Sequence, residues 1–173
     1  MRLTRSFFDR DVLQVAPELI GKTLVRMKKD FPEFYIITEV EAYRGIEDEA
    51  SHARFGKTSR NNVMFASGGL VYVYLIYGMY WMLNFVTGAE GQAQAILIRG
   101  IEGLDGPGKL TKALEIDKSF NGENLASSER IWLEEGAEKP LIIQKPRYGI
   151  GYAGEPWKSM PWRYIKVQQP ETF

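Results

Sequence analysis

The sequence predicts an α+β domain in which short strands dominate the middle of the chain and the helices are short and peripheral. Two β-branched and aromatic runs, residues 71–76 and 80–86, are separated by Tyr77-Gly78, which is typical of a β-hairpin. Helical signals are confined to two short segments. The 173 residues contain no repeat and no linker rich in proline, glycine or serine, so a single domain over residues 1–173 is predicted.

The N-terminal part of the chain predicts one helix and two strands. The helix begins at Asp9 or Asp11, either of which can act as N-cap, and ends at Leu19-Ile20 before Gly21. Apolar and β-branched runs then predict strands at residues 22–27 and 34–42.

The predicted hairpin has an unusual tip. Gly78 supplies the positive φ angle that a tight turn needs, which places the aromatic Tyr77 beside it at the tip. Smaller polar residues usually occupy such positions, so Tyr77 calls for a functional explanation.

The rest of the chain predicts three further strands and one helix. Strands are expected at residues 95–99, 141–143 and 162–167. The helix is expected over residues 109–114, with Asp105 as its N-cap and a proline in its first turn.

The formal net charge is zero, with 22 basic and 22 acidic residues, which argues against bulk electrostatic capture of nucleic acid. The charges are unevenly distributed, however. Six acids and one base lie in residues 31–50, whereas residues 51–60 carry Arg54, Lys57 and Arg60 and no acid. Local cationic character is therefore still possible.

The 29 residues from Asn61 to Ala89 carry no charge, but they do not predict a membrane span. Ser67-Gly68-Gly69, Gly78 and Asn84 interrupt them, and tyrosines are frequent. The charged N-terminus also lacks a signal-peptide core. We therefore expect no membrane partner, and a location in the cytoplasm with the nucleoid for a bacterial protein or in the nucleus for a eukaryotic one.

The absence of cysteine excludes disulfides, thiol nucleophiles and iron–sulfur clusters. A single histidine, His52, excludes two-histidine metal motifs and disfavours zinc. No metal and no cofactor are expected.

Two titratable residues are candidates for chemistry. Glu41 ends an apolar strand beside aromatic residues, where a carboxylate can have a raised pKa and act as a base; alternatively it is a solvated strand residue that alternates with Glu39. His52 follows the acidic loop 47–49 and either contacts a substrate or pairs with those acids.

Several tyrosines lie on or near the hairpin. They either form the packed face of a sheet or build an aromatic pocket for a flat, cationic ligand. Asn84 sits within a strand and needs a hydrogen-bond partner, either a nucleobase edge or the backbone. Gly106-Pro107-Gly108-Lys109 precedes a helix and could meet a phosphate, although it falls short of a P-loop.

Taken together, these residues resemble the alkyladenine (3-methyladenine, methylpurine) DNA glycosylase family. The resemblance covers nearly the whole chain. It is carried by Glu41-Ala42-Tyr43-Arg44-Gly45, Glu47-Asp48-Glu49-Ala50-Ser51-His52, Arg60-Asn61, Met64-Phe65, Tyr72-Val73-Tyr74-Leu75-Ile76-Tyr77-Gly78-Met79-Tyr80, Leu97-Ile98-Arg99-Gly100, Gly106-Pro107-Gly108-Lys109-Leu110 and Gly149-Ile150-Gly151-Tyr152. The segment between Asn84 and Arg99 is slightly longer than the family pattern.

The resemblance implies a curved, mainly antiparallel sheet with a protruding hairpin, and a role for particular residues. Glu41 would activate a water, and Arg99 and the backbone of Ile150 would help to hold that water. The remaining roles are a base sandwich (Tyr43 and Tyr74), contact with the base edge (His52), rejection of the guanine 2-amino group (Asn84), a wedge in the duplex (Tyr77) and contact with the DNA backbone (Thr58, Arg60 and Lys109).

The implied activity is that of a monofunctional, monomeric DNA N-glycosylase. It would flip alkylated or deaminated purines out of double-stranded DNA and hydrolyse the N-glycosidic bond, and so begin base excision repair. Its substrates would be 3-methyladenine, 7-methylguanine, hypoxanthine and ethenoadenine. The alternative is a non-catalytic nucleic-acid binding module in which the tyrosine hairpin only stacks exposed bases.

Overall fold

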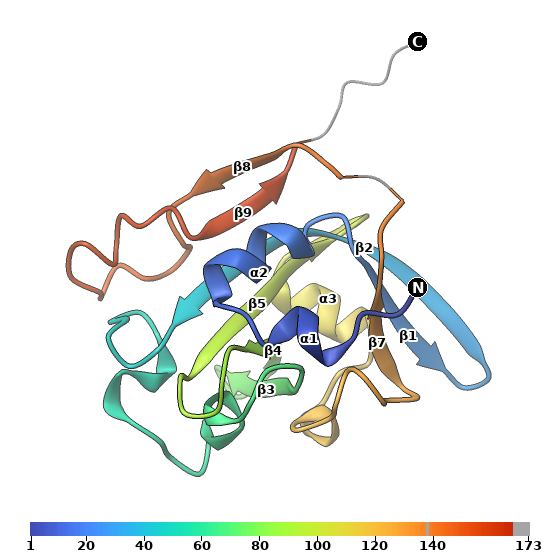
Figure 1. Cartoon of the computed structure of the whole chain (residues 1–173), viewed down its shortest axis with the longest axis horizontal. Helices are drawn as coiled ribbons and strands as arrows, with labels where there is room; N and C mark the ends of the chain where they lie inside the picture. Colours follow the sequence, from blue (N-terminus) through green and yellow to red (C-terminus); the bar gives the residue numbers. More distant parts are fainter. Residues whose placement is uncertain (138, 168–173) are drawn as a thin grey trace.

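Strand β2 (Phe31–Arg44) is the longest strand of the computed structural model and organises the sheet around it (Figure 1). The structure describes residues 1–137 and 139–167. β2 pairs with β1 (Thr23–Lys28) along its first half and with β5 (Gln94–Ile101) and β9 (Arg163–Lys166) along its second half, always antiparallel. Register shifts between Ile37 and Val40 separate the two halves. The second half therefore lies between two neighbours, where its side chains can be buried on both faces.

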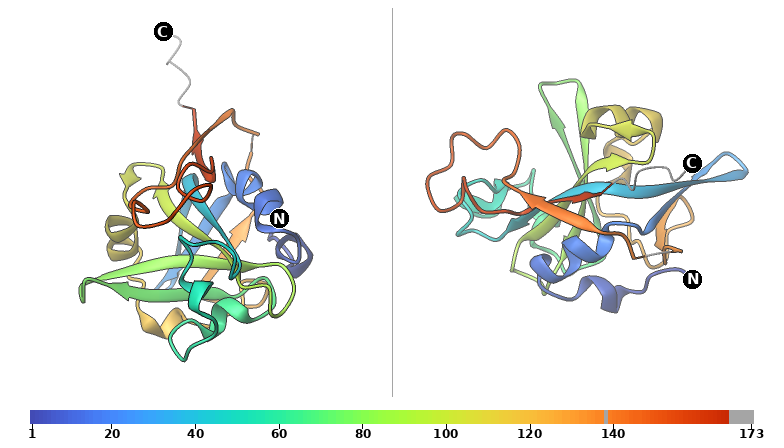
Figure 2. Two further views of the ribbon diagram at one scale, coloured as in Figure 1. Left: turned by 90° about the vertical axis from the view of Figure 1, so that its left-hand side faces the viewer. Right: turned by 90° about the horizontal axis from the view of Figure 1, so that it is seen from above.

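Further strands extend the sheet on either side. Its order is β3-β4-β5-β2-β1-β7, in which β3 is Val71–Ile76, β4 is Tyr80–Thr87 and β7 is Ile131–Glu134. The remaining elements are β6 (Leu104–Asp105), β8 (Ile142–Lys145), α1 (Arg5–Phe8), α2 (Val12–Leu19), α3 (Pro107–Ala113) and the 3-10 helices η1 (His52–Phe55), η2 (Asn62–Phe65) and η3 (Lys118–Phe120). The sheet curls within one compact domain, with α1 and α2 on the opposite side from α3 (Figures 1 and 2). The predicted α+β class is confirmed.

Helix α2 forms where the sequence predicts it. Asp11 is its N-cap and accepts a hydrogen bond from the Leu13 backbone N–H at 2.9 Å, and Gly21 follows the helix with a φ of 87°. Val12, Val15 and Leu19 are fully buried against the sheet. Because these apolar residues recur at helical spacing, α2 presents one apolar face to the sheet and covers that side of the core.

The predicted hairpin is formed by β3 and β4, which pair from Val71 with Phe85 to Ile76 with Tyr80. It projects from the body of the protein (Figure 2). Both Tyr77 and Gly78 have positive φ angles, 53° and 65°, and the Met79 N–H donates to the Ile76 carbonyl to close the turn. Only Gly78 was expected to adopt this conformation.

The expected N-cap of the second helix is wrong. α3 begins at Pro107 with Gly106 as its N-cap, and no side chain caps it. Asp105 instead belongs to β6 and pairs with Gly100. Gly106 takes a φ of 104°, a conformation that favours glycine, so the chain turns one residue later than a side-chain cap at Asp105 would require.

The uncharged run of residues 61–89 forms η2, β3 and β4. Across residues 1–137 and 139–167, no helix is long and apolar enough to cross a membrane.

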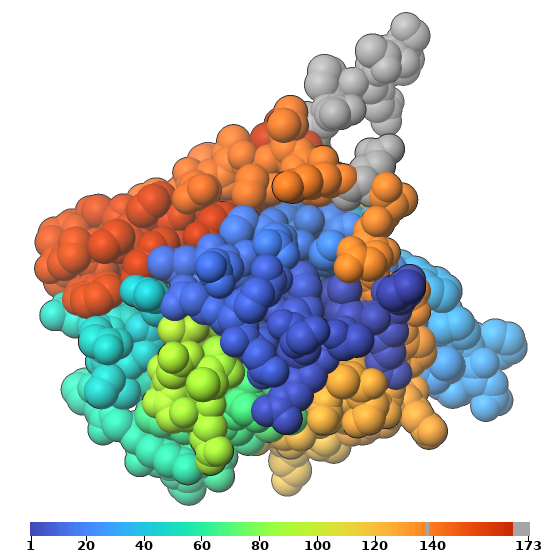
Figure 3. Space-filling model, viewed as in Figure 1, coloured from blue at the N-terminus to red at the C-terminus, as the bar shows by residue number. Residues whose placement is uncertain are grey.

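The C-terminal segment returns across the molecule and lies beside segments that are distant in sequence. In Figure 3 this segment, orange to red, lies above the blue atoms of α2 and meets the cyan and teal loop that follows β2. The Arg147 guanidinium and the Asp48 carboxylate form a fully buried ion pair at this junction. The junction forms part of the wall of the site described next.

Candidate active site

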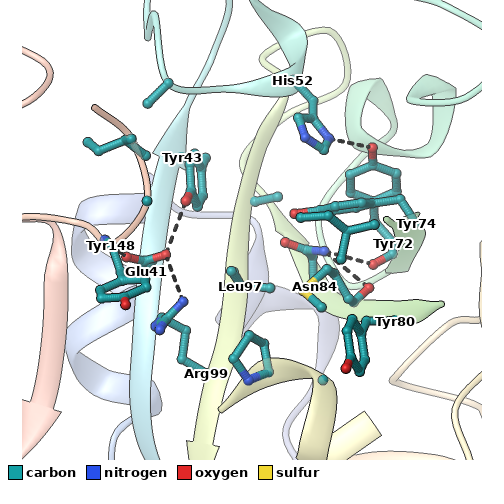
Figure 4. A pocket seen from close by; sticks show the side chains of 18 of the residues that line it. Glu41, Tyr43, His52, Tyr72, Tyr74, Tyr80, Asn84, Leu97, Arg99 and Tyr148 are labelled. Atoms are coloured by element: carbon teal, nitrogen blue, oxygen red, sulfur yellow. Dashed lines mark hydrogen bonds and ion pairs between the residues drawn. The ribbon is translucent and has the colours of Figure 1, made fainter. Parts of the chain in front are cut away.

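A pocket of about 820 Å³ opens between the second half of β2, the β3–β4 hairpin, the start of α3 and the loop after β8. In Figure 4, Glu41, Tyr43, Arg99 and Tyr148 form one wall, and His52, Tyr72, Tyr74 and Asn84 form the facing wall. Arg54, Arg60, Tyr77, Tyr80, Lys109, Ile150 and Tyr152 are among the other lining residues.

Glu41 is fully buried, so the interpretation of this residue as a solvated strand residue is wrong. Its side chain points into the pocket from a part of β2 that is flanked by β5 and β9 (Figure 4). Its carboxylate accepts hydrogen bonds from the Tyr43 hydroxyl at 3.1 Å and from the Tyr148 backbone N–H.

Burial raises the pKa of the Glu41 carboxyl, whereas the charge of Arg99 and the hydrogen bonds from Tyr148 and Tyr43 act to lower it. Burial is the largest of these effects. Glu41 is therefore a stronger base than an ordinary surface glutamate, and three groups fix its orientation.

Arg99 is shared between two carboxylates. Its Nη1 lies 3.6 Å from Oε1 of Glu41, and its Nε donates to Oε1 of Glu39 at 3.2 Å. Arg163 also donates to Glu39, at 3.1 Å. The Arg99 guanidinium further lies 5.0 Å from the centre of the Tyr148 ring. Glu41 thus receives only part of the positive charge of Arg99.

The facing wall is aromatic. The rings of His52 and Tyr74 lie 4.3 Å apart at an interplanar angle of 64°, and those of Tyr72 and Tyr74 lie 5.4 Å apart. Burial raises the pKa of Tyr72 to about 12 and raises the pKa values of Tyr43 and Tyr74 as well. These phenols are therefore protonated near neutral pH. Tyr72 is buried in the sheet, and all five tyrosines of the set, Tyr43, Tyr72, Tyr74, Tyr77 and Tyr80, line the pocket.

The expected pairing of His52 with the preceding acids is wrong. Its Nδ1 lies 3.4 Å from the Tyr72 hydroxyl, while Asp48 binds Arg147 and Glu49 accepts from the Gly154 N–H. Burial, followed by the charges of Arg60 and Arg54, lowers the pKa of His52. The imidazole is therefore neutral near pH 7.

Asn84 finds its partners in the backbone. Its amide nitrogen donates to the carbonyl of Tyr72 at 3.2 Å and to that of Met82 at 3.4 Å. These bonds fix the side chain as part of the pocket wall.

Of the residues expected near DNA, Tyr77, Arg60 and Lys109 line the pocket and are exposed, whereas Thr58 lies outside its lining. Tyr77 is 84% exposed at the hairpin tip, and Lys109 is also exposed. Arg60 donates to the Leu75 carbonyl at 2.6 Å, so its position is fixed while its charge is not neutralised by that bond. The Thr58 hydroxyl accepts from the Asn61 N–H at 3.3 Å on the exposed loop outside the pocket lining.

The 106–109 segment has a packing role at the mouth. A Cβ atom on Gly108 would lie 2.9 Å from Cδ1 of Tyr80, so the glycine permits the hairpin to pack against α3. Ile150 is buried and lines the pocket from the loop after β8.

Arg147 and Tyr148 are the site residues that sequence reasoning missed. Besides its pair with Asp48, Arg147 donates to the Ala42 carbonyl at 3.0 Å, and its guanidinium lies 4.8 Å from the centre of the Tyr43 ring. The sequence around Arg147 and Tyr148 predicts only a loop between two strands, because their contacts with the site are made with residues about a hundred positions earlier in the chain.

The model of the methylpurine-DNA glycosylase family matches residues 6–170 of this chain. The chain belongs to the methylpurine-DNA glycosylase family. Its resemblance to that family, inferred from the sequence, is thereby confirmed.

Three relatives within this family illustrate the extent of the similarity, and each bears the name "Putative 3-methyladenine DNA glycosylase". One from Methanocella arvoryzae is 40% identical, with 97% of this chain and 94% of the relative covered. One from Desulfitobacterium hafniense is 43% identical, with 94% of each chain covered. One from Wolbachia pipientis is 45% identical, with 94% of this chain and 88% of the relative covered.

Proposed function

We propose that this protein is a monofunctional DNA N-glycosylase that removes alkylated and deaminated purines from double-stranded DNA by hydrolysis. The observation that carries the proposal is Glu41, a buried and oriented carboxylate that faces an aromatic wall across a pocket large enough for a purine nucleotide. Family membership and the names of the relatives support the same activity.

The target nucleotide must leave the duplex before it can enter this pocket. Extrusion costs a few kcal/mol of stacking and pairing free energy, and the cost is smaller for a damaged base. The exposed Tyr77 ring at the tip of a projecting hairpin can fill the space that the nucleotide vacates. Arg60 and Lys109 line the pocket and are exposed, so they would be able to meet the flanking phosphates.

The pocket favours damaged purines through its aromatic walls. Tyr43 and Tyr74 lie on opposite walls, so a flipped base would stack between them with His52 near its edge. Purines alkylated at N3 or N7, such as 3-methyladenine and 7-methylguanine, are cationic and gain an additional attraction to aromatic faces. Asn84, fixed by its bonds to the backbone, would oppose the 2-amino group of normal guanine.

Hydrolysis requires one base and one water. Glu41 takes a proton from the water as the water oxygen bonds to C1′, and the glycosidic bond breaks with its electron pair passing to the purine. The negative charge of Glu41 also stabilises the oxocarbenium-like sugar. Arg99 and the Ile150 backbone would help to orient the water. The single lysine among the lining residues, Lys109, lies at the exposed mouth, which favours water over an amine as the nucleophile.

Cationic and neutral lesions differ in the leaving group. A cationic purine leaves as a neutral base, whereas hypoxanthine and ethenoadenine need a proton. The lowered pKa of His52 makes it a poor proton donor near pH 7, so we assign this proton to water.

The test is base release from a duplex that carries ethenoadenine or hypoxanthine, with Glu41→Gln as the matched variant. The wild-type protein should release the base, and Glu41→Gln should bind the lesion duplex but release at least a hundred-fold less, because general base catalysis typically contributes 10²–10⁴-fold. Lesion binding by the wild type without any release would instead identify a non-catalytic binding module.

A further inference from the structure

Three planar side chains form a stack at the mouth of the pocket. The Arg54 guanidinium lies 4.5 Å from the centre of the Phe55 ring and 5.0 Å from the centre of the Tyr152 ring. Phe55 is 83% exposed, and Tyr152 is exposed as well. Arg54 and Tyr152 also line the pocket, so the stack continues the pocket wall outward to Phe55.

The stack is held in a fixed position relative to the pocket. The Tyr152 hydroxyl donates to the Ala50 carbonyl at 3.0 Å, and Arg54 donates to the Ser51 carbonyl at 3.3 Å. Phe55 ends η1, the helix that begins with His52, and the Ser51 hydroxyl caps that helix. The same short helix therefore presents His52 to the pocket and Phe55 to the outside.

The charges around the stack fit an anionic partner. Residues 51–60 contain three cationic side chains and no acid. Of the nearest acids in sequence, Asp48 is neutralised by the buried Arg147, whereas the exposed Glu49 accepts from the Gly154 N–H at 2.7 Å and keeps its charge, so cations outnumber acids around the stack. Exposed aromatic rings among cations are the features by which proteins bind unstacked nucleic-acid strands.

We propose that the stack of Phe55, Arg54 and Tyr152 binds the DNA strand that enters the pocket. The exposed face of Phe55 stacks on a nucleobase that flanks the extruded nucleotide, and Arg54 faces the adjoining phosphate. The contact involves only the damaged strand, whereas a wedge such as Tyr77 acts within the duplex. The inference rests on the proposed function, because that function identifies the strand as DNA.

The test compares Phe55→Ala with Phe31→Ala. Phe31 is a matched control because it is 75% exposed and lies at the start of β2, outside the pocket lining. Both substitutions are made in the Glu41→Gln background, and binding is measured to labelled DNA that carries one hypoxanthine, as a duplex and as a single strand. Phe55→Ala should raise Kd by about 5- to 150-fold on both, since stacking of one base contributes about 1–3 kcal/mol. Phe31→Ala should leave Kd unchanged.

Further variants identify the type of contact. Phe55→Trp should retain wild-type affinity because the indole ring also stacks, and Phe55→Leu should not. Full affinity in Phe55→Leu would overturn the stacking assignment, and equal Kd values for Phe55→Ala and Phe31→Ala would overturn the proposal.

Base release from the same DNA is also measured with the protein that retains Glu41. This measurement distinguishes a failure of the present inference from a failure of the proposed glycosylase activity. Release with binding that does not depend on Phe55 would reject only this inference. Binding that depends on Phe55 without any release would reject only the glycosylase activity.

Discussion

Glu41 and Asp48 are both fully buried carboxylates near the end of β2, yet the protein surrounds them differently. Asp48 accepts two hydrogen bonds from the Arg147 guanidinium, at 2.5 and 2.9 Å, and two from backbone N–H groups, at 3.0 Å each. Glu41 has its nearest guanidinium nitrogen at 3.6 Å, and Arg99 divides its charge between Glu41 and Glu39. Burial alone therefore does not distinguish the structural carboxylate of Asp48 from the carboxylate of Glu41, which we propose to be the base; the two differ in how completely they are paired.

The Asp48–Arg147 ion pair also helps to position the groups around Glu41. Arg147 places its neighbour Tyr148 so that the Tyr148 N–H reaches Glu41, and the Arg147 guanidinium lies beside the Tyr43 ring. Asp48 thus acts on the pocket through Arg147, without lining the pocket itself.

The largest expected effect is a loss of folding stability in the Asp48→Asn variant. This substitution leaves Arg147 buried without its carboxylate and should lower the free energy of unfolding by about 3–5 kcal/mol, measured by denaturant titration. Glu41→Gln is the matched control and should cost far less, because its pairing is incomplete. Equal losses in the two variants would contradict the distinction between the two sites.

The second prediction concerns the pH dependence of excision. Glu41 must be deprotonated to act as a base, so the rate falls as pH falls through its raised pKa. Arg99 opposes that rise, so Arg99→Gln should raise the pKa of Glu41 further and move the acid limb of the rate to higher pH.

The measurement is single-turnover release of 7-methylguanine, whose cationic leaving group needs no added proton. Arg163→Gln is the control, since Arg163 binds Glu39 and forms no ion pair with Glu41 within the described part of the chain. An acid limb that moves equally in both variants would show that Arg99 acts through Glu39 rather than on Glu41.

The smallest expected effect is the dependence of DNA affinity on salt concentration, which reports on the cationic side chains available to DNA. Arg54 and Arg60 make hydrogen bonds to backbone carbonyls, which leave their charges available, and Lys109 lies exposed at the mouth. Release of counterions from so few phosphates predicts a log–log salt dependence of Kd with a slope of about −2 to −4. A slope near −8, measured with lesion duplex in the Glu41→Gln variant, would contradict this view of a lightly charged DNA interface.

The parts of the fold that depend on local pattern could be predicted from the sequence. The α2 helix, the β3–β4 hairpin and the strands around Glu41 follow from short runs of residues, although the sequence left Asp9 and Asp11 open as the cap of α2. The four-residue β7 was missed, although strands were predicted at the equally short β8 and β9. The Asp105 cap failed because Gly106 could turn the chain instead.

The site was predictable only where the chain carries its residues close together or in a family pattern. Glu41, Tyr43 and His52 lie within twelve residues of one another and were found. Arg147 and Tyr148 meet them from the other end of the chain, and no local spacing encodes such a contact. Zero net charge was misleading for a related reason, since a sum over the chain hides the cationic side chains that gather at one opening.

The positive φ of Tyr77 has a consequence for how the protein can evolve. A left-handed backbone costs a residue with a Cβ atom roughly 1–2 kcal/mol, and glycine would avoid that cost. Selection for folding stability alone would therefore replace this tyrosine. If Tyr77 is the wedge proposed above, stability and duplex binding make opposite demands on this position, and substitutions that stabilise the hairpin tip would weaken DNA binding.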